Sequence, residues 1–306
     1  MSNQKSKSIV GIFLLITMLF ILFLIFAFFT VKNLKGTDSL KIGDSATAPI
    51  GVVEVEGVIM DSKDTVRKLL KAEEDDNIKA IIVRVNSPGG AVGPTQEIYE
   101  EIRRIDKIKP VYASFGTVAA SGGYYIGAAC RKIYSNAGAM TGSIGVIMNF
   151  MNFSKLYEFA KVKPEIIKAG KYKDIGNMAR DMTDEEKLLL TEMTDNVHDQ
   201  FIMDIFKVRE KIIVDGLEGL KRYAQGQIFS GQEAKDRGLV DEIAGLWEAG
   251  RRIHAELKLK SKFDFNFIKL KKDQLGIMEI LGNLEQTVRD FSYSVKNQSV
   301  PLYLHQ

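Results

Sequence analysis

The chain has 306 residues, 45 % of them hydrophobic, so it can bury a substantial core. Its 42 basic and 39 acidic residues leave a net charge of +3, and the positive charge forms no blocks, which argues against a nucleic-acid-binding surface. The single cysteine, Cys130, excludes an internal disulfide framework and a cysteine-rich metal site. We expect neither a metal nor a cofactor.

The first predicted element is an uncharged, apolar segment of 23 residues at 9–31. As a helix rising about 1.5 Å per residue it would reach roughly 34 Å, enough to cross a bilayer core. A cleaved signal peptide is the alternative, but the run exceeds the usual apolar region of about 7 to 15 residues, and no small-x-small cleavage site ends it. We therefore predict a transmembrane anchor at 9–31, after a short flank at 1–8 and before a tether at 32–48. Lysines on both sides leave its orientation undecided.

Between residues 49 and 257, short apolar runs alternate with charged helical patterns, which is typical of an α/β fold. The predicted strands lie at 50–59, 80–85, 111–115, 132–135 and 144–148, and the predicted helices at 65–74, 95–106, 121–129 and 154–160. Capping boxes at Thr183 and Ser230 open two more helices, and Gly238 is a plausible C-terminal cap.

The chain changes character in its last part, a C-terminal extension at 258–306. Phe263, Phe265 and Phe267 alternate there with polar residues, which predicts a further strand. The sequence does not define a role for this extension.

Ser121 is the candidate nucleophile, because it follows a predicted strand and begins a glycine-rich helix. The chain has three histidines; His198 and His254 lie in charged helical stretches, and His305 is the penultimate residue. If Ser121 is a nucleophile, a lysine must therefore activate it. The alternative is that Ser121 only caps its helix, as most serines in such positions do.

Backbone amides near Ser121 could bind the oxyanion that its attack would create. The N–H of Gly122 lies beside the serine at the start of the helix, and the Pro88-Gly89-Gly90 loop supplies further N–H groups. The alternative is a simple turn, since Asn-Ser-Pro-Gly-Gly is a good turn sequence.

The segment from Lys171 to Ile175 offers the candidate base. Lowering the pKa of a lysine from about 10.4 to about 7 requires roughly 4 to 5 kcal/mol of preference against the ammonium, which burial can supply. Most lysines in such loops are simply solvated. The carboxylate of Asp174 would raise the pKa of Lys173 if it pointed the same way, so we expect it to point elsewhere.

Four short motifs in this order carry a resemblance to a known family: Asn86-Ser-Pro-Gly-Gly90, Val118-Ala-Ala-Ser-Gly-Gly-Tyr-Tyr125, Thr141-Gly-Ser-Ile-Gly145 and Gly170-Lys-Tyr-Lys-Asp-Ile175. Together they resemble the signal peptide peptidase A family, which are membrane-anchored serine endopeptidases. The resemblance covers roughly residues 52–257. It implies an α/β fold of the ClpP/crotonase type, a spiral of ββα units.

The resemblance also implies roles for individual residues. Ser121 matches the nucleophile of the family and Lys173 its general base. Ser143 matches the hydroxyl that orients the lysine, and Gly89 (to within one residue) and Gly122 match the oxyanion-hole amides. The family mechanism needs no cofactor.

This chain carries one copy of the serine and one of the lysine, so it resembles the short form of the family. That form implies a homo-oligomer in which the serine–lysine dyad is formed across subunits. It also implies a catalytic domain outside the cytoplasmic membrane, a bilayer as partner, and hydrophobic peptides such as remnant signal peptides as substrates.

Two other functions remain open on the sequence alone. A crotonase-type acyl-CoA enzyme would use the same oxyanion amides without a nucleophile. A catalytically silent, membrane-anchored oligomeric scaffold would need neither the serine nor the lysine.

Overall fold

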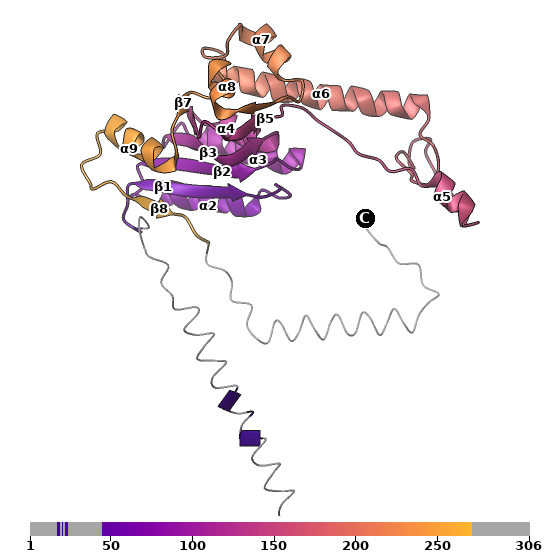
Figure 1. Ribbon diagram of the computed structural model, residues 1–306, viewed down its shortest axis with the longest axis horizontal. Coiled ribbons are helices and arrows are strands. Elements are labelled where there is room, and N and C mark those ends of the chain that lie inside the picture. Colours follow the sequence, from indigo (N-terminus) through magenta and orange to yellow (C-terminus); the bar gives the residue numbers. More distant parts are fainter. Residues whose placement is uncertain (1–16, 19, 21, 24–44, 271–306) are drawn as a thin grey trace, which may run out of the picture. The chain divides into compact units, whose positions relative to one another are not determined.

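The computed structural model describes residues 17–18, 20, 22–23 and 45–270 of the chain (Figure 1). None of the helices in these ranges is both long and apolar enough to cross a membrane. Apart from five residues, the predicted anchor at 9–31 lies outside the described residues, as do most of the tether and the extension beyond residue 270.

The strands and helices alternate through most of the described chain. The strands are β1 (Ile50–Glu56), β2 (Ala80–Ser87), β3 (Val111–Ala120), β4 (Lys132–Ser135), β5 (Met140–Gly142), β6 (Ile228–Ser230), β7 (Glu242–Ile243) and β8 (Phe265–Phe267). The helices are α2 (Lys63–Glu74), α3 (Val92–Ile105), α4 (Gly122–Ala128), α5 (Ser154–Phe159), α6 (Asp184–Arg209), α7 (Gly216–Tyr223), α8 (Gly231–Asp236) and α9 (Leu246–Glu256).

All eight strands belong to one sheet, in which β6, β5, β3, β2, β1 and β8 are neighbours in that order (Figure 1). Strand β4 pairs with β3, and β7 pairs with β4. Every pairing is parallel except that between β5 and β6. The α/β fold is as predicted; its sheet is mostly parallel, and the fold is consistent with the ClpP/crotonase type.

Strand β2 is buried on both faces, which explains its continuous apolar run. Ile81, Val83 and Val85 enter the larger core, together with the apolar stripes of α2 and α3. Ala80 and Ile82 enter the smaller core on the other face, where α9 packs. The amino-terminal halves of β2 and β3 are therefore packed on both faces of the sheet.

The sheet continues beyond residue 257, because β8 pairs in parallel with β1. Phe265 is fully buried and contacts the rings of Phe263, Phe267 and Trp247. The strand predicted from the alternating phenylalanines is confirmed, and residues up to Ile268 belong to the same compact unit as the sheet.

The strand predicted at 144–148 is wrong. The strand in this region is β5, which ends at Gly142. The φ angles of Gly142 (80°) and Ser143 (49°) are positive, and the Ser143 N–H donates to Gln227 O at 2.6 Å. The backbone thus turns out of the sheet before the apolar run begins, so residues 144–148 have no strand to pair with.

Helix α6 begins with the predicted capping box. Thr183 Oγ1 accepts the N–H of Glu186 at 3.2 Å, and the Glu186 carboxylate accepts the N–H of Thr183 at 2.8 Å. Phe201, Ile202 and Ile205, in the C-terminal half of α6, are buried in the larger core. The capping box at Ser230 is also confirmed.

Candidate active site

Ser121 lies between the end of β3 and the start of α4, in a backbone conformation that side-chain-bearing residues rarely adopt. Its φ is 52° and its ψ is −121°, a combination that costs about 1 to 3 kcal/mol for a residue other than glycine. Its N–H donates to Gly142 O at 2.9 Å. Its side chain makes no capping hydrogen bond to α4, so the alternative of a simple helix cap does not hold.

A bulge in β3 delivers Ser121 to this position. The pairing of β2 with β3 shifts between Val85 and Ser87, and β3 carries two more residues than β2 across that shift. The Asn86 side chain holds the extra residues, because its Oδ1 accepts the N–H of Thr117 at 2.8 Å and that of Val118 at 3.4 Å. Asn86 therefore fixes the stretch of chain that leads to the serine.

The glycine loop after β2 lies directly against Ser121. Gly89 has a φ of 105°, and a Cβ there would lie 2.8 Å from Gly122 N and 2.9 Å from Ser121 Cβ. The Gly89 N–H donates to Ser87 Oγ at 3.1 Å. No hydrogen bond engages the N–H of Gly90 within residues 45–270. The Gly90 nitrogen lies 3.3 Å from the position of a Cβ on Gly122.

A cavity of about 120 Å³ opens beside these groups, and Ser121, Gly122 and Gly90 line it. The rest of its lining is mostly apolar: Val92, Tyr125, Val146, Ile147, Val197 and Phe201. The Tyr125 hydroxyl donates to Asp204 Oδ2 at 2.5 Å, and burial raises the pKa of Tyr125. The cavity is small and mostly apolar, so it suits a small apolar side chain.

Ser143 joins this group. The register of β3 with β5 pairs Ala120 with Gly142, so the residues that follow each of them are Ser121 and Ser143. Both serines have positive φ angles, 52° and 49°. Of the site residues predicted from sequence, the structure thus brings together Ser121, Gly122, Gly89 and Ser143.

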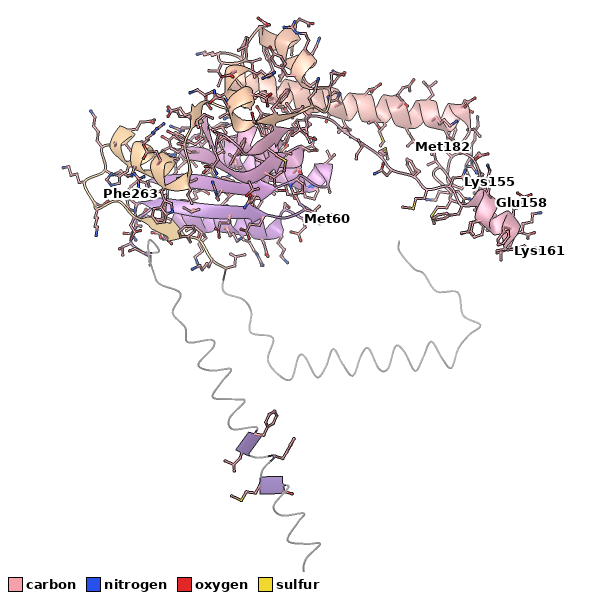
Figure 2. All side chains as sticks on the ribbon, in the orientation of Figure 1. Met60, Lys155, Glu158, Lys161, Met182 and Phe263 are labelled. Atoms are coloured by element: carbon pink, nitrogen blue, oxygen red, sulfur yellow. The ribbon has the colours of Figure 1, made fainter. Side chains whose placement is uncertain are left out.

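Lys173 is not part of this group. It does not line the cavity, and no hydrogen bond or ion pair in the described part of the chain links it to Ser121. It is exposed, in a turn within the segment at 146–183. Figure 2 shows Lys155, Glu158 and Met182 of this segment apart from Met60, which lies just after β1.

Within residues 45–270, the lysines near Lys173 form ion pairs and Lys173 does not. Lys168 is paired with Asp174, and Lys171 with Glu185. The hydrogen bond to Glu185 raises the pKa of Lys171, which makes that side chain a poorer base. The ammonium of Lys173 has no ion pair among residues 45–270.

Asp174 points elsewhere, as expected. Its carboxylate binds Lys168 and Arg180, and these bonds lower the pKa of Asp174. Sequence reasoning identified neither Arg180 nor the role of Asn86. Asn86 begins one of the four motifs, but the sequence assigns its side chain no role, and no local pattern singles out Arg180.

Two histidines lie within the described residues, and neither His198 nor His254 lines the cavity beside Ser121. His254 Nε2 instead lies 2.8 Å from Ser261 O. The site therefore has a serine, backbone donors and an apolar cavity, and no imidazole.

The sequence of this chain is similar to known proteins over the strands of the sheet and over the residues of the candidate site. The model of peptidase family S49 matches residues 103–260, and that of Clp protease matches residues 53–142. A protein of Synechocystis sp. named "Putative protease" is 38 % identical over 214 residues, which are 70 % of this chain and 76 % of that protein.

Two further relatives carry more specific names. "Putative signal peptide peptidase SppA" of Enterococcus faecium is 35 % identical over 71 % of this chain and 61 % of that protein. "Serine protease SPPA, chloroplastic" of Arabidopsis thaliana is 30 % identical over 81 % of this chain and 36 % of that protein. The matched region is thus less than two thirds of the length of these two relatives. The matches and the site agree, and the chain belongs to the serine proteases of peptidase family S49.

Proposed function

We propose that the protein is an endopeptidase that uses a Ser121–Lys173 dyad. Lys173 Nζ takes the proton of Ser121 Oγ, and Oγ attacks the carbonyl carbon of the scissile peptide. The lysine passes the proton to the leaving amine, which leaves an acyl-enzyme. Water then loses a proton to the same lysine and releases the acyl group, restoring Ser121.

The conformation of Ser121 is the observation that carries this proposal. A strained backbone angle persists only where the surroundings enforce it, and such strain gathers at functional sites. Here it leaves the hydroxyl without a capping bond, beside an apolar cavity. A serine that served only as a cap would adopt an extended backbone and bind the helix amides.

The Gly90 and Gly122 amides fit the oxyanion hole best. The resemblance implied Gly89 to within one residue, but the Gly89 N–H is already bonded to Ser87 Oγ, and Gly90 lines the cavity. The oxyanion would lie between the amides of Gly90 and Gly122. Ser143, directly after the residue paired with Ala120, would then bind and orient the incoming lysine.

The lysine that serves a given Ser121 would come from a second copy of the chain. The cavity has no cationic side chain in its lining, and Lys173, in an exposed segment, forms no ion pair with any other residue of 45–270. That segment also exposes large apolar side chains, with Ile147 81 %, Phe159 86 % and Ile167 fully exposed. Apolar surface of this extent suits an interface between copies.

Substrates would be hydrophobic peptides with small apolar side chains near the cut, which fit the cavity beside Ser121. Two of the relatives carry the name signal peptide peptidase or its abbreviation, and we extend that substrate class to this chain. With the anchor at 9–31, the catalytic domain would stand outside the cytoplasmic membrane, close to where such remnants lie. The copies would assemble into a ring, and the spiral of ββα units would form the body of each subunit.

The test uses single variants of the full chain and a fluorogenic hydrophobic peptide. Ser121→Ala and Lys173→Ala should each lower turnover by about a thousandfold or more, because each removes a member of one catalytic unit. Lys171→Ala is the matched control and should retain activity, since that lysine is paired with Glu185. Unchanged thermal unfolding would show that the variants fold.

Normal turnover in Lys173→Ala would overturn the proposed base. Failure of an acylating probe to label Ser121 in the wild-type protein would overturn the proposed nucleophile, and thioester binding without proteolysis would favour an acyl-CoA enzyme.

A further inference from the structure

The residue next to the proposed base carries a carboxylate that two cations hold in place. Arg180 Nε donates to Asp174 Oδ2 at 2.9 Å, and Arg180 Nη2 donates to the Asp174 backbone oxygen at 3.2 Å. Lys168 binds the other carboxylate oxygen, Oδ1. Both carboxylate oxygens of Asp174 are therefore bound by cations other than Lys173.

Arg180 is itself anchored to the start of α6. Its guanidinium binds both oxygens of Glu186, with Nη1–Oε2 at 2.8 Å and Nη2–Oε1 at 2.6 Å. Glu186 is only 3 % exposed and also closes the capping box with Thr183. The bond with Arg180 lowers the pKa of Glu186 to about 2, so this carboxylate stays charged at working pH. The turn that carries Lys173 is thus tied to a long helix through one arginine.

We propose that Arg180 and Lys168 form a clamp that keeps the carboxylate of Asp174 away from Lys173, so that the base can lose its proton. The proposal rests on the proposed role of Lys173. Arg180 and Lys168 are positioning residues here, because they act on Asp174 and not on the substrate. Glu186 holds the clamp to the fold.

The physical reason lies in how a carboxylate affects a lysine. A negative charge within about 4 to 6 Å favours the ammonium and raises its pKa by about 1 to 3 units. A general base must instead lose its proton near the working pH. An aspartate next to the catalytic lysine in sequence is therefore harmful unless another cation holds it.

The charged and titratable groups around this turn come from three parts of the chain. The turn and the residues before it contribute Lys168, Lys171, Tyr172 and Asp174; the linker to α6 contributes Arg180 and Asp181; and the first turn of α6 contributes Asp184, Glu185, Glu186 and Lys187. Glu185 is taken by Lys171 and Tyr172, and Glu186 by Arg180. Asp174 is therefore the carboxylate that release of the clamp would free beside Lys173.

The test is the pH profile of peptide cleavage by the full chain. Activity rises as pH increases through the pKa of the lysine, since the neutral amine is the active form. Arg180→Met and Lys168→Met should each move this acidic limb to higher pH. The shift should be about one pH unit where the carboxylate of Asp174 swings to Lys173. Such a shift lowers kcat/KM at neutral pH about tenfold. In an Asp174→Asn background, neither substitution should move the limb upward.

Several controls make the result decisive. Arg222→Met, on α7, breaks an exposed ion pair with Asp215 and should leave the profile in place. Lys168→Met leaves Glu186 paired, so it answers the question even if Arg180→Met does not fold. A substitution that only damages the structure would lower the cleavage rate on the alkaline plateau of the pH profile without moving the acidic limb.

An unmoved limb in Lys168→Met and in any folded Arg180→Met protein, with Lys173→Ala inactive, would overturn the clamp and leave the proposed dyad intact. An equal shift in the Asp174→Asn background would also overturn the clamp, because the lost cation alone would then explain it. Full activity of Lys173→Ala would instead overturn the proposed function.

Discussion

At the scale of single residues, the site depends on how closely backbones approach one another. Gly89 lies against Ser121 and Gly122, and Gly122 in turn lies against Thr95, where a Cβ would come within 2.9 Å of Thr95 Oγ1. Side chains at these positions would displace the serine or the amides beside it. The spacing of the proposed nucleophile and its oxyanion donors therefore depends on residues that have no side chain.

Gly89→Ala should harm both stability and activity. A φ of 105° is strained for alanine, and the added methyl group would collide with Gly122 N and Ser121 Cβ, so we expect a loss of about 1 to 3 kcal/mol in the free energy of unfolding. Displacement of the site by about 1 Å should lower kcat about a hundredfold. Denaturant unfolding and peptide cleavage measure the two effects.

Gly93→Ala is the matched control, since it lies in α3 with open space around it. This variant should be as stable as the wild type or more stable by about 0.5 to 1 kcal/mol, with unchanged cleavage. Equal behaviour of the two alanine variants would contradict the close approach of Gly89 to Ser121.

At the scale of elements, the bulge in β3 is the feature that places the serine. An undistorted pairing of β2 with β3 would continue the register of Val85 with Phe115. The end of β3, and Ser121 after it, would then lie at a different position. The bulge leaves the N–H groups of Thr117 and Val118 without a partner on the neighbouring strand. The Asn86 side chain accepts their hydrogen bonds instead.

Asn86→Ala should therefore lower kcat strongly and the free energy of unfolding only slightly. Water can reach the freed Thr117 amide, so the expected cost is about 1 kcal/mol of unfolding free energy. Asn86→Asp keeps an acceptor oxygen and should recover most of the activity. Comparison of kcat with the midpoint of urea unfolding separates the two effects, and equal kcat in both variants would refute the role of the acceptor.

The elements that sequence predicted correctly are those with strong local signals. The run of β2 is apolar because both faces are buried, and the capping boxes at Thr183 and Ser230 each satisfy backbone groups within three residues. The strand at 144–148 was wrong because positive φ angles at Gly142 and Ser143 turn the chain first, and hydrophobicity does not report φ.

The site was predictable to a similar extent. The order of four motifs pointed to Ser121, Gly122 and Ser143, which the fold brings together through the pairing of β3 with β5. The free amide of Gly90 could not be distinguished from that of Gly89, because this depends on which N–H Ser87 Oγ binds. The clamp at Arg180 depends on contacts between a turn and a helix start, which no single motif contains.

At the scale of the whole molecule, Ser121 and its cavity lie at the end of β3, whereas Lys173 lies in the exposed segment at 146–183 of the same compact unit. In the proposed function, the exposed apolar side chains of that segment and the cation-free cavity are two parts of one site. A second copy would supply what each lacks, in a head-to-tail arrangement that closes into a ring.

Mixing two inactive variants tests this claim most directly. Subunits of Ser121→Ala and Lys173→Ala are dissociated, combined in equal amounts and reassembled, and cleavage of a hydrophobic peptide is measured. If the dyad joins two copies, about a quarter of the sites in random rings contain an intact Ser121 and an intact Lys173, so about a quarter of the wild-type activity should return. Mixed assemblies that stay as inactive as their parents would show that serine and lysine must belong to the same chain, and would contradict the account.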